Sequence, residues 1–227
     1  MGSPMSIPFP TSVRLLVLIL ALGISRSSAE DVYPSQAGDV LVLGSNDAAW
    51  RPLLAELAAK GTVYAPFTER RHFAFRSVPV ILQGEMRLDP ERGLSLHYLS
   101  PEVSTMIVDA KGVVLRDARG RSRALPNDPS SPSAATALLP VLRFDLVGLD
   151  RNFTIRAARA GAAWRFDFTP KNPELKRSLG SIVVEGQGDL VRQLEFRRSA
   201  TQSVSIEVGD PKSGVVFGSD EAARYFR

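Results

Sequence analysis

The chain has 227 residues, of which 44% are hydrophobic and 23% charged, with 28 Lys and Arg against 24 Asp and Glu. Its formal net charge of +4 is well below the basic excess of a nucleic-acid-binding protein, so we expect no nucleic-acid partner. Cysteine is absent, which excludes disulfides, a thiol nucleophile and thiolate metal sites.

An apolar run near the N-terminus predicts export. Residues 15–24 read LLVLILALGI, Arg14 precedes them, and residues 27–29 (SSA) supply the small side chains of a cleavage site. The run is too short to span a membrane, which takes about 20 apolar residues. We therefore predict that residues 1–29 are a cleaved signal peptide and that residues 30–227 form one exported domain. Because Glu30 and not cysteine follows the cut, we expect no lipid anchor.

The first predicted helix follows a short strand at residues 40–43. Asn46 or Asp47 is expected to cap this helix, Pro52 lies in or near its first turn, and Gly61 marks its end. Its apolar stripe follows helical spacing and consists of Trp50, Leu53, Leu54, Leu57 and Ala58.

From residue 62 onward the apolar side chains recur with a period of two, which predicts strands. A first group covers residues 67–72, 80–88, 94–98, 106–108 and 113–116, with a short partner at 121–125. A second group covers residues 153–156, 164–168, 181–185, 190–197 and 202–208. The connections are short, so neighbouring strands are expected to pair antiparallel as a meander. The pattern predicts a mainly β domain of about ten or eleven strands.

An apolar segment at residues 134–149 separates the two groups and follows a polar loop at 127–132. It lacks the alternation of a strand, which favours helix. Because a proline removes a helical hydrogen bond and restricts the residue before it, Pro140 is expected to divide two short helices, 134–139 and 141–146.

Little in the sequence points to catalysis. The two histidines, His72 and His97, lie on strands beside polar neighbours and are interpreted as solvent-facing, and no nucleophile elbow, metal motif or phosphate loop occurs. Residues 186–189 (GQGD) are expected to form a hairpin turn, and Asp167 and Glu185 are expected to point outward from separate strands. We therefore predict a protein that is not an enzyme and needs no metal or cofactor.

Arginines cluster in three places, at residues 70–71, 116–123 and 197–198. Most alternate with apolar residues or lie in turns, so we interpret them as the solvated face of a sheet. Contact with an acidic protein or with anionic lipid headgroups is the alternative.

The order of the strands and turns resembles that of the LolA family, the periplasmic lipoprotein carriers of Gram-negative bacteria. Residues 67–70 (FTER), 83–86 (QGEM), a proline turn, 94–96 (LSL) and 100–104 (SPEVS) follow one another as the family's F-T-Q, G-D-L, aromatic-rich strand and Q-P-D-E-S segments do. Residues 166–171 (FDFTPK) are similar to its F-x-L-T-P-K segment, and residues 188–196 parallel its next hairpin. The resemblance covers residues 48–208.

This resemblance implies an unclosed half-barrel with an N-terminal helix and a short helical lid, whose concave face takes acyl chains. The residues that it assigns to this face are Phe67, Val80, Leu82, Met86, Leu88, Leu94, Leu96, Tyr98, Met106, Val108, Trp164 and Phe166. Those that it assigns to the lid are Leu138, Leu139, Val141 and Leu142. The family latches its lid with an arginine just before the turn proline. Here Asp89 precedes Pro90, so Arg92 becomes the candidate for the latch.

The function implied is a periplasmic, monomeric carrier of lipoprotein acyl chains or other lipid-like cargo. Its partners would be inner-membrane release machinery and an outer-membrane receptor. The leading alternative is a non-catalytic sensor or interaction module that regulates a membrane protein, and a third is a hydrolase using His72 or His97. The carrier hypothesis predicts that Leu96→Glu impairs cargo transfer while leaving the fold largely intact.

Overall fold

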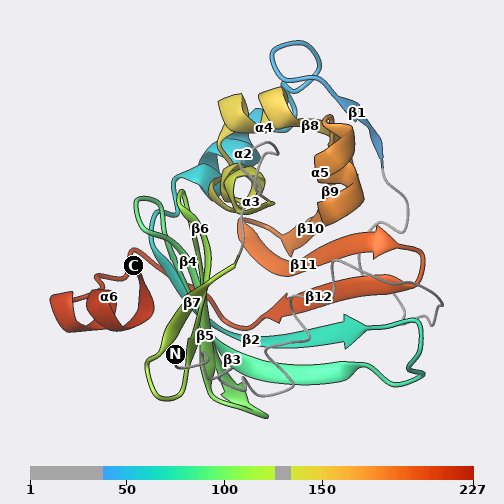
Figure 1. Cartoon of the computed structure of the whole chain (residues 1–227). Coiled ribbons are helices and arrows are strands. Elements are labelled where there is room, and N and C mark those ends of the chain that lie inside the picture. Colours follow the sequence, from blue (N-terminus) through green and yellow to red (C-terminus); the bar gives the residue numbers. More distant parts are fainter. Residues whose placement is uncertain (1–37, 126–133) are drawn as a thin grey trace.

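The fold is described from a computed structural model, which places residues 38–125 and 134–227 (Figure 1). Within these residues one antiparallel sheet contains the strands β1 (Asp39–Leu41), β2 (Val63–His72), β3 (Val80–Asp89), β4 (Gly93–Ser100), β5 (Ser104–Asp109), β6 (Gly112–Asp117), β7 (Ser122–Ala124), β8 (Phe153–Ala160), β9 (Ala163–Pro170), β10 (Ser181–Gln187), β11 (Leu190–Ser199), β12 (Gln202–Val208) and β13 (Lys212–Ser213). The helices are α2 (Arg51–Ala58), α3 (Ala134–Arg143), α4 (Leu146–Asn152), α5 (Pro173–Leu179) and α6 (Ser219–Tyr225). The predicted signal peptide and the loop at 127–132 lie outside the described residues.

The sheet consists of two antiparallel meanders. Strands β2 to β7 pair in chain order, as do β8 to β12, and the two groups join where β12 pairs antiparallel with β2. Strand β1 adds to β8, so β1 and β7 are the two ends of the sheet path and do not pair with each other within the described residues. The predicted mainly β, unclosed half-barrel is therefore confirmed.

Strand irregularities accompany the strong curvature of the sheet. Register shifts occur next to Gly84 in β3 and Gly186 in β10, where the partner strand carries one extra residue, Leu99 in β4 and Arg192 in β11. A Cβ on Gly186 would lie 2.1 Å from the Trp164 ring, so glycine allows that indole to lie flat against the neighbouring strand. The turn that follows has Gly188 at φ +58°, which confirms the hairpin predicted for residues 186–189.

Helices α2, α3, α4 and α5 lie over one face of the curved sheet, which is its concave face (Figure 1). Their buried leucines join the inward side chains of the strands in one hydrophobic core. From α2 the core takes Leu53, Leu54 and Leu57, as the apolar stripe predicts. The predicted cap is wrong: Trp50 is the N-cap residue and makes no side-chain cap. Asp47 instead pairs with Arg51.

The lid differs from its prediction at Pro140. Helix α3 continues through this residue and ends at Arg143. The next residue, Phe144, has a φ of +49°, which lies outside the right-handed helical region. The expected division of the segment at Pro140 was therefore wrong. Helix α4 begins after Asp145, whose carboxylate accepts the Val147 N–H.

The C-terminal segment covers part of the convex face, which the sequence analysis did not anticipate. Helix α6 lies on the opposite side of the sheet from the other helices (Figure 1). Its Glu221 accepts a hydrogen bond from Arg87, and the Arg87 guanidinium lies 3.8 Å from the centre of the Tyr225 ring. The ring of His97 lies 5.1 Å from that of Tyr225. His97 is therefore half-buried, which corrects its interpretation as a solvent-facing residue.

This burial gives a pH-dependent prediction. Burial lowers the pKa of His97, and the nearby Arg87 and Arg224 add to the effect, while Glu85 opposes it. The unfolded chain then binds a proton at His97 more readily than the folded chain does, so this residue removes stability as the pH falls below about 6.5. We expect His97→Gln to lose less stability than the parent protein between pH 7.5 and 5.5 in urea unfolding. His72→Gln is the matched control, and an equal loss in the parent and His97→Gln proteins would contradict the prediction.

Candidate functional site

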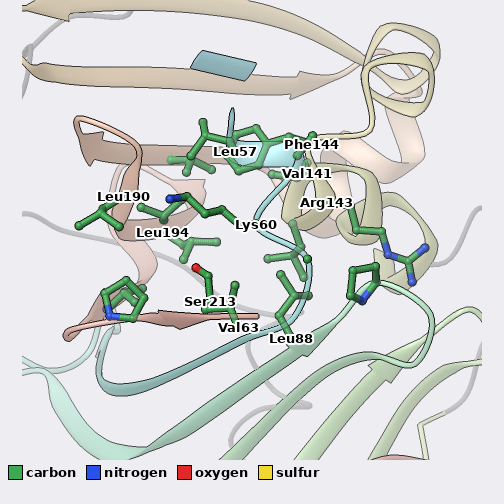
Figure 2. Close-up of a pocket in the computed structure, with 18 of the residues that line it drawn as sticks. Leu57, Lys60, Val63, Leu88, Val141, Arg143, Phe144, Leu190, Leu194 and Ser213 are labelled. Carbon is green, nitrogen blue, oxygen red and sulfur yellow. The ribbon is translucent and has the colours of Figure 1, made fainter. Parts of the chain in front are cut away.

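A cavity of about 160 Å³ lies between the lid and the concave face of the sheet (Figure 2). Its walls are mainly apolar. The strands contribute Val63, Met86, Leu88, Val184, Leu190, Val191, Leu194 and Val208. The helices and the lid turn contribute Leu57, Ala58, Val141, Leu142 and Phe144. Such a mainly apolar lining suits an apolar ligand.

The polar side chains of this site lie mainly at its rim. Lys60, just after α2, forms an ion pair with Asp189 in the β10–β11 turn. The hydrogen bond from the Lys60 ammonium holds the pKa of Asp189 below its usual value. Arg143, at the end of α3, contributes another cation to the lining (Figure 2). The cavity is thus apolar inside and charged at its edge.

All twelve residues assigned to the ligand-binding face belong to the same side of the sheet. Nine are buried in the core, and Val80, Leu88 and Met106 are partly buried against it. Only Met86 and Leu88 border the cavity. Leu96 is 1% exposed and does not border it. In this structure most of the assigned face is therefore packed core.

Of the residues assigned to the lid, too, only some border the cavity and the others are packed in the interior. Leu138, Val141 and Leu142 join the core, and Val141 and Leu142 also border the cavity. Leu139 is buried outside that cluster. Arg92 has a different partner from the one expected: its guanidinium donates to Asp89 of its own turn, at 2.8 Å. The arginine of the lid that borders the cavity is Arg143.

The side of the cavity formed by β10, β11 and the residues after α2 was not predicted from the sequence. Leu190 and Val191 were recognised as strand residues, and their position directly after the hairpin turn was the available signal. Lys60 and Asp189 could not be paired from the sequence, because 129 residues separate them.

One buried polar cluster lies on the concave face away from the cavity. The carboxylate of Glu69 accepts hydrogen bonds from Arg71 and, at 2.7 Å, from the Tyr98 hydroxyl. Burial and the Glu69 carboxylate raise the pKa of Tyr98 well above its ordinary value, so this phenol stays protonated. Arg71 is 2% exposed, which corrects its interpretation as a solvated arginine. Arg70, its neighbour, points to the other face and pairs with Glu207.

Asp167 and Glu185 lie on separate strands, β9 and β10, as expected, but Glu185 is buried and one arginine joins the two. Arg165 donates to Asp167 at 2.7 and 2.9 Å and to Glu185 at 3.0 Å, across two strands. Both carboxylates accept hydrogen bonds from the same guanidinium. Within residues 38–125 and 134–227, no group of three or more His, Asp or Glu side chains is placed to hold a metal ion.

A model of the family described as outer membrane lipoprotein carrier protein LolA-like matches residues 44–215. The match takes in the first helix, the lid and nearly the whole sheet. The chain belongs to this LolA-like family. The family is a binding and carrier family and is not known as an enzyme family.

Solved structures of similar fold include the LolA superfamily protein of Nitrosomonas europaea, with 7% identity, a TM-score of 0.42, and coverage of 76% of this chain and 96% of that one. A lipoprotein-sorting protein domain from Vibrio parahaemolyticus has 8% identity and a TM-score of 0.40, and 75% and 93% of the two chains are covered. MucB, solved in complex with MucA(peri), has 13% identity, a TM-score of 0.39, and 78% and 58% coverage. The comparison with curated proteins found no match.

The LolA-like chain has no described helix that is both long and apolar enough to cross a membrane.

The ion pair at the rim gives a prediction about ligand exchange. Lys60 is partly exposed, so its removal is expected to leave stability nearly unchanged. The pair links the end of α2 to the β10–β11 turn beside the cavity, and breaking it frees one side of the rim. We expect Lys60→Ala to release bound diphenylhexatriene several-fold faster in stopped-flow fluorescence. Lys176→Ala, on the exposed side of α5, is the control. An unchanged release rate in Lys60→Ala would show that the pair does not limit exchange.

Proposed function

We propose that this LolA-like protein is a periplasmic carrier that binds acyl chains of a lipoprotein or another lipidated molecule and moves them towards the outer membrane. The observation that carries the proposal is the apolar cavity between the lid and the concave face. Residues 1–29 act as the export signal and are removed. The mature chain is a monomer that exchanges its cargo with release machinery at the inner membrane and a receptor at the outer membrane.

The energetics of acyl chains explain why such a cavity is needed. Each methylene group transferred out of water contributes about 0.8 kcal/mol, so one long chain contributes on the order of 10 kcal/mol. A dry apolar cavity of about 150 Å³ in another protein holds a molecule the size of benzene. The cavity here is of similar size and takes only part of a long chain, so loading requires the lid to move.

The contacts of α3 suit a lid that moves. Between Ala137 and Arg143, where the side chains are described, none makes a hydrogen bond or ion pair with the sheet. Val141 and Leu142 hold the helix by apolar contact alone. Apolar contacts can be replaced by a similar apolar ligand, so the acyl chain would take over the surface that the lid leaves.

The test is the lipid content of the full chain expressed with its leader and purified from the periplasm. We expect organic extraction and mass spectrometry to find about one acylated molecule per protein. A protein that carries no lipid and takes none from membranes would contradict the proposal.

The same measurement separates the alternative class. A sensor or interaction module that regulates a membrane protein would bind its protein partner whether or not lipid is present. A carrier must hold lipid after purification in aqueous buffer.

A further inference from the structure

Arg143 lies at the edge of the cavity, and its Nε–H has no acceptor among the described residues. It ends α3, one residue after the cavity residue Leu142, and Figure 2 shows its side chain at the rim. Its Nε atom is buried and has no hydrogen-bond partner. Among the described residues none forms an ion pair with its guanidinium. A buried N–H without an acceptor is unfavourable, so a ligand that supplies one is favoured.

The acidic side chains around this position already have partners. Asp89 accepts the backbone N–H groups of Glu91 and Arg92 and pairs with the Arg92 guanidinium. Asp145 accepts the Val147 N–H at the start of α4. Across the cavity, Asp189 is held by Lys60. Among the described residues, none of these carboxylates is therefore available to the Arg143 guanidinium.

We propose that the cargo is an amphiphile with an anionic head, whose chain enters the cavity while its carboxylate or phosphate oxygens accept hydrogen bonds from Arg143. This inference rests on the proposed carrier function and narrows its cargo. The apolar walls of the cavity match the apolar chain of the ligand. The Arg143 guanidinium at the rim matches the anionic head of the ligand in both charge and position. A neutral hydroxyl or carbonyl head could accept a hydrogen bond from Arg143 but would not balance its positive charge.

The test compares three probes that share one chain: hexadecanoate, hexadecyl phosphate and hexadecanol. Each displaces diphenylhexatriene from the full mature protein, and the fluorescence gives its affinity. We expect the two anions to bind about tenfold or more tightly than the alcohol, because hydrogen bonds to charged groups are about twice as strong as neutral ones. The preference should weaken as salt is raised. The carboxylate and phosphate arms show which head the site prefers.

Arg143→Gln is expected to lose the preference for anions and to keep the affinity for hexadecanol. Arg151→Gln, which removes the same charge from an exposed position on α4, is expected to behave as the parent protein does. Equal affinity of the parent for the alcohol and the anions would overturn this inference and leave the carrier function standing. An Arg143→Gln protein that still prefers the anions to the alcohol would also overturn this inference and leave the carrier function standing. Failure of all three probes to bind would overturn both the anionic-head inference and the carrier function.

Discussion

Replacing Val63 by tryptophan is expected to abolish binding of apolar ligands without loss of stability. Val63 is the first residue of β2, is partly buried, and borders the cavity (Figure 2). The larger indole would occupy the space that we assign to the acyl chain. Filling an existing cavity costs little and often stabilises a fold by about 0.5–2 kcal/mol. We therefore expect at least about a tenfold loss of affinity for diphenylhexatriene, while the midpoint of urea unfolding stays the same or rises.

The control is the same substitution at a position away from the cavity. Val216 is 89% exposed and does not border it, so Val216→Trp should bind the probe as the parent does. If Val63→Trp binds diphenylhexatriene with the parent's affinity, the ligand lies elsewhere on the protein.

Leu96→Glu is expected to destabilise the whole domain and not only to impair cargo binding. Leu96 is 1% exposed in the centre of β4, with Met86 and Met106 opposite it on the neighbouring strands. Truncating a buried leucine costs about 2–5 kcal/mol, and a buried carboxylate without a partner costs more. Because a domain has only about 5–15 kcal/mol in total, we expect Leu96→Glu to be largely unfolded or to lose at least about 4 kcal/mol.

Leu99→Glu provides the matched comparison on the same strand. Leu99 is 50% exposed on the outer side, and a surface change of this kind usually alters stability by less than about 0.5 kcal/mol. Circular dichroism during urea unfolding measures both variants. A Leu96→Glu protein as stable as Leu99→Glu would mean that position 96 accepts a charge with the fold largely intact, as expected from the sequence.

The strands were predictable because their signal is local. Alternation identified nearly every strand of the two meanders, and the glycine turn at residues 186–189 was correctly placed. Alternation also implied that Arg70 and Arg71 point to opposite faces, although both were interpreted as solvated. The structure puts Arg71 on the concave side, where Glu69 and Tyr98 satisfy it.

The arrangement of the two meanders was not predictable, because it depends on contacts between distant segments. The pairing of β12 with β2 and the ion pair of Lys60 with Asp189 both join the two meanders. The sequence also could not show which apolar side chains pack together and which border a cavity. That difference depends on the volumes of side chains from several strands, not on the pattern of any one. Helix α6 was missed because its described side chains include none that is fully buried, so it has no apolar stripe.

The central claim is that the cavity beneath the lid carries an acyl chain through water. The most direct measurement is the rate at which phosphatidylglycerol with a pyrene-labelled acyl chain moves from donor to acceptor vesicles in the presence of the mature protein. We expect the parent protein and Val216→Trp to accelerate this transfer in proportion to their concentration, and Val63→Trp not to accelerate it. Transfer at the rate of vesicles alone, or equal transfer by Val63→Trp and the parent protein, would contradict it.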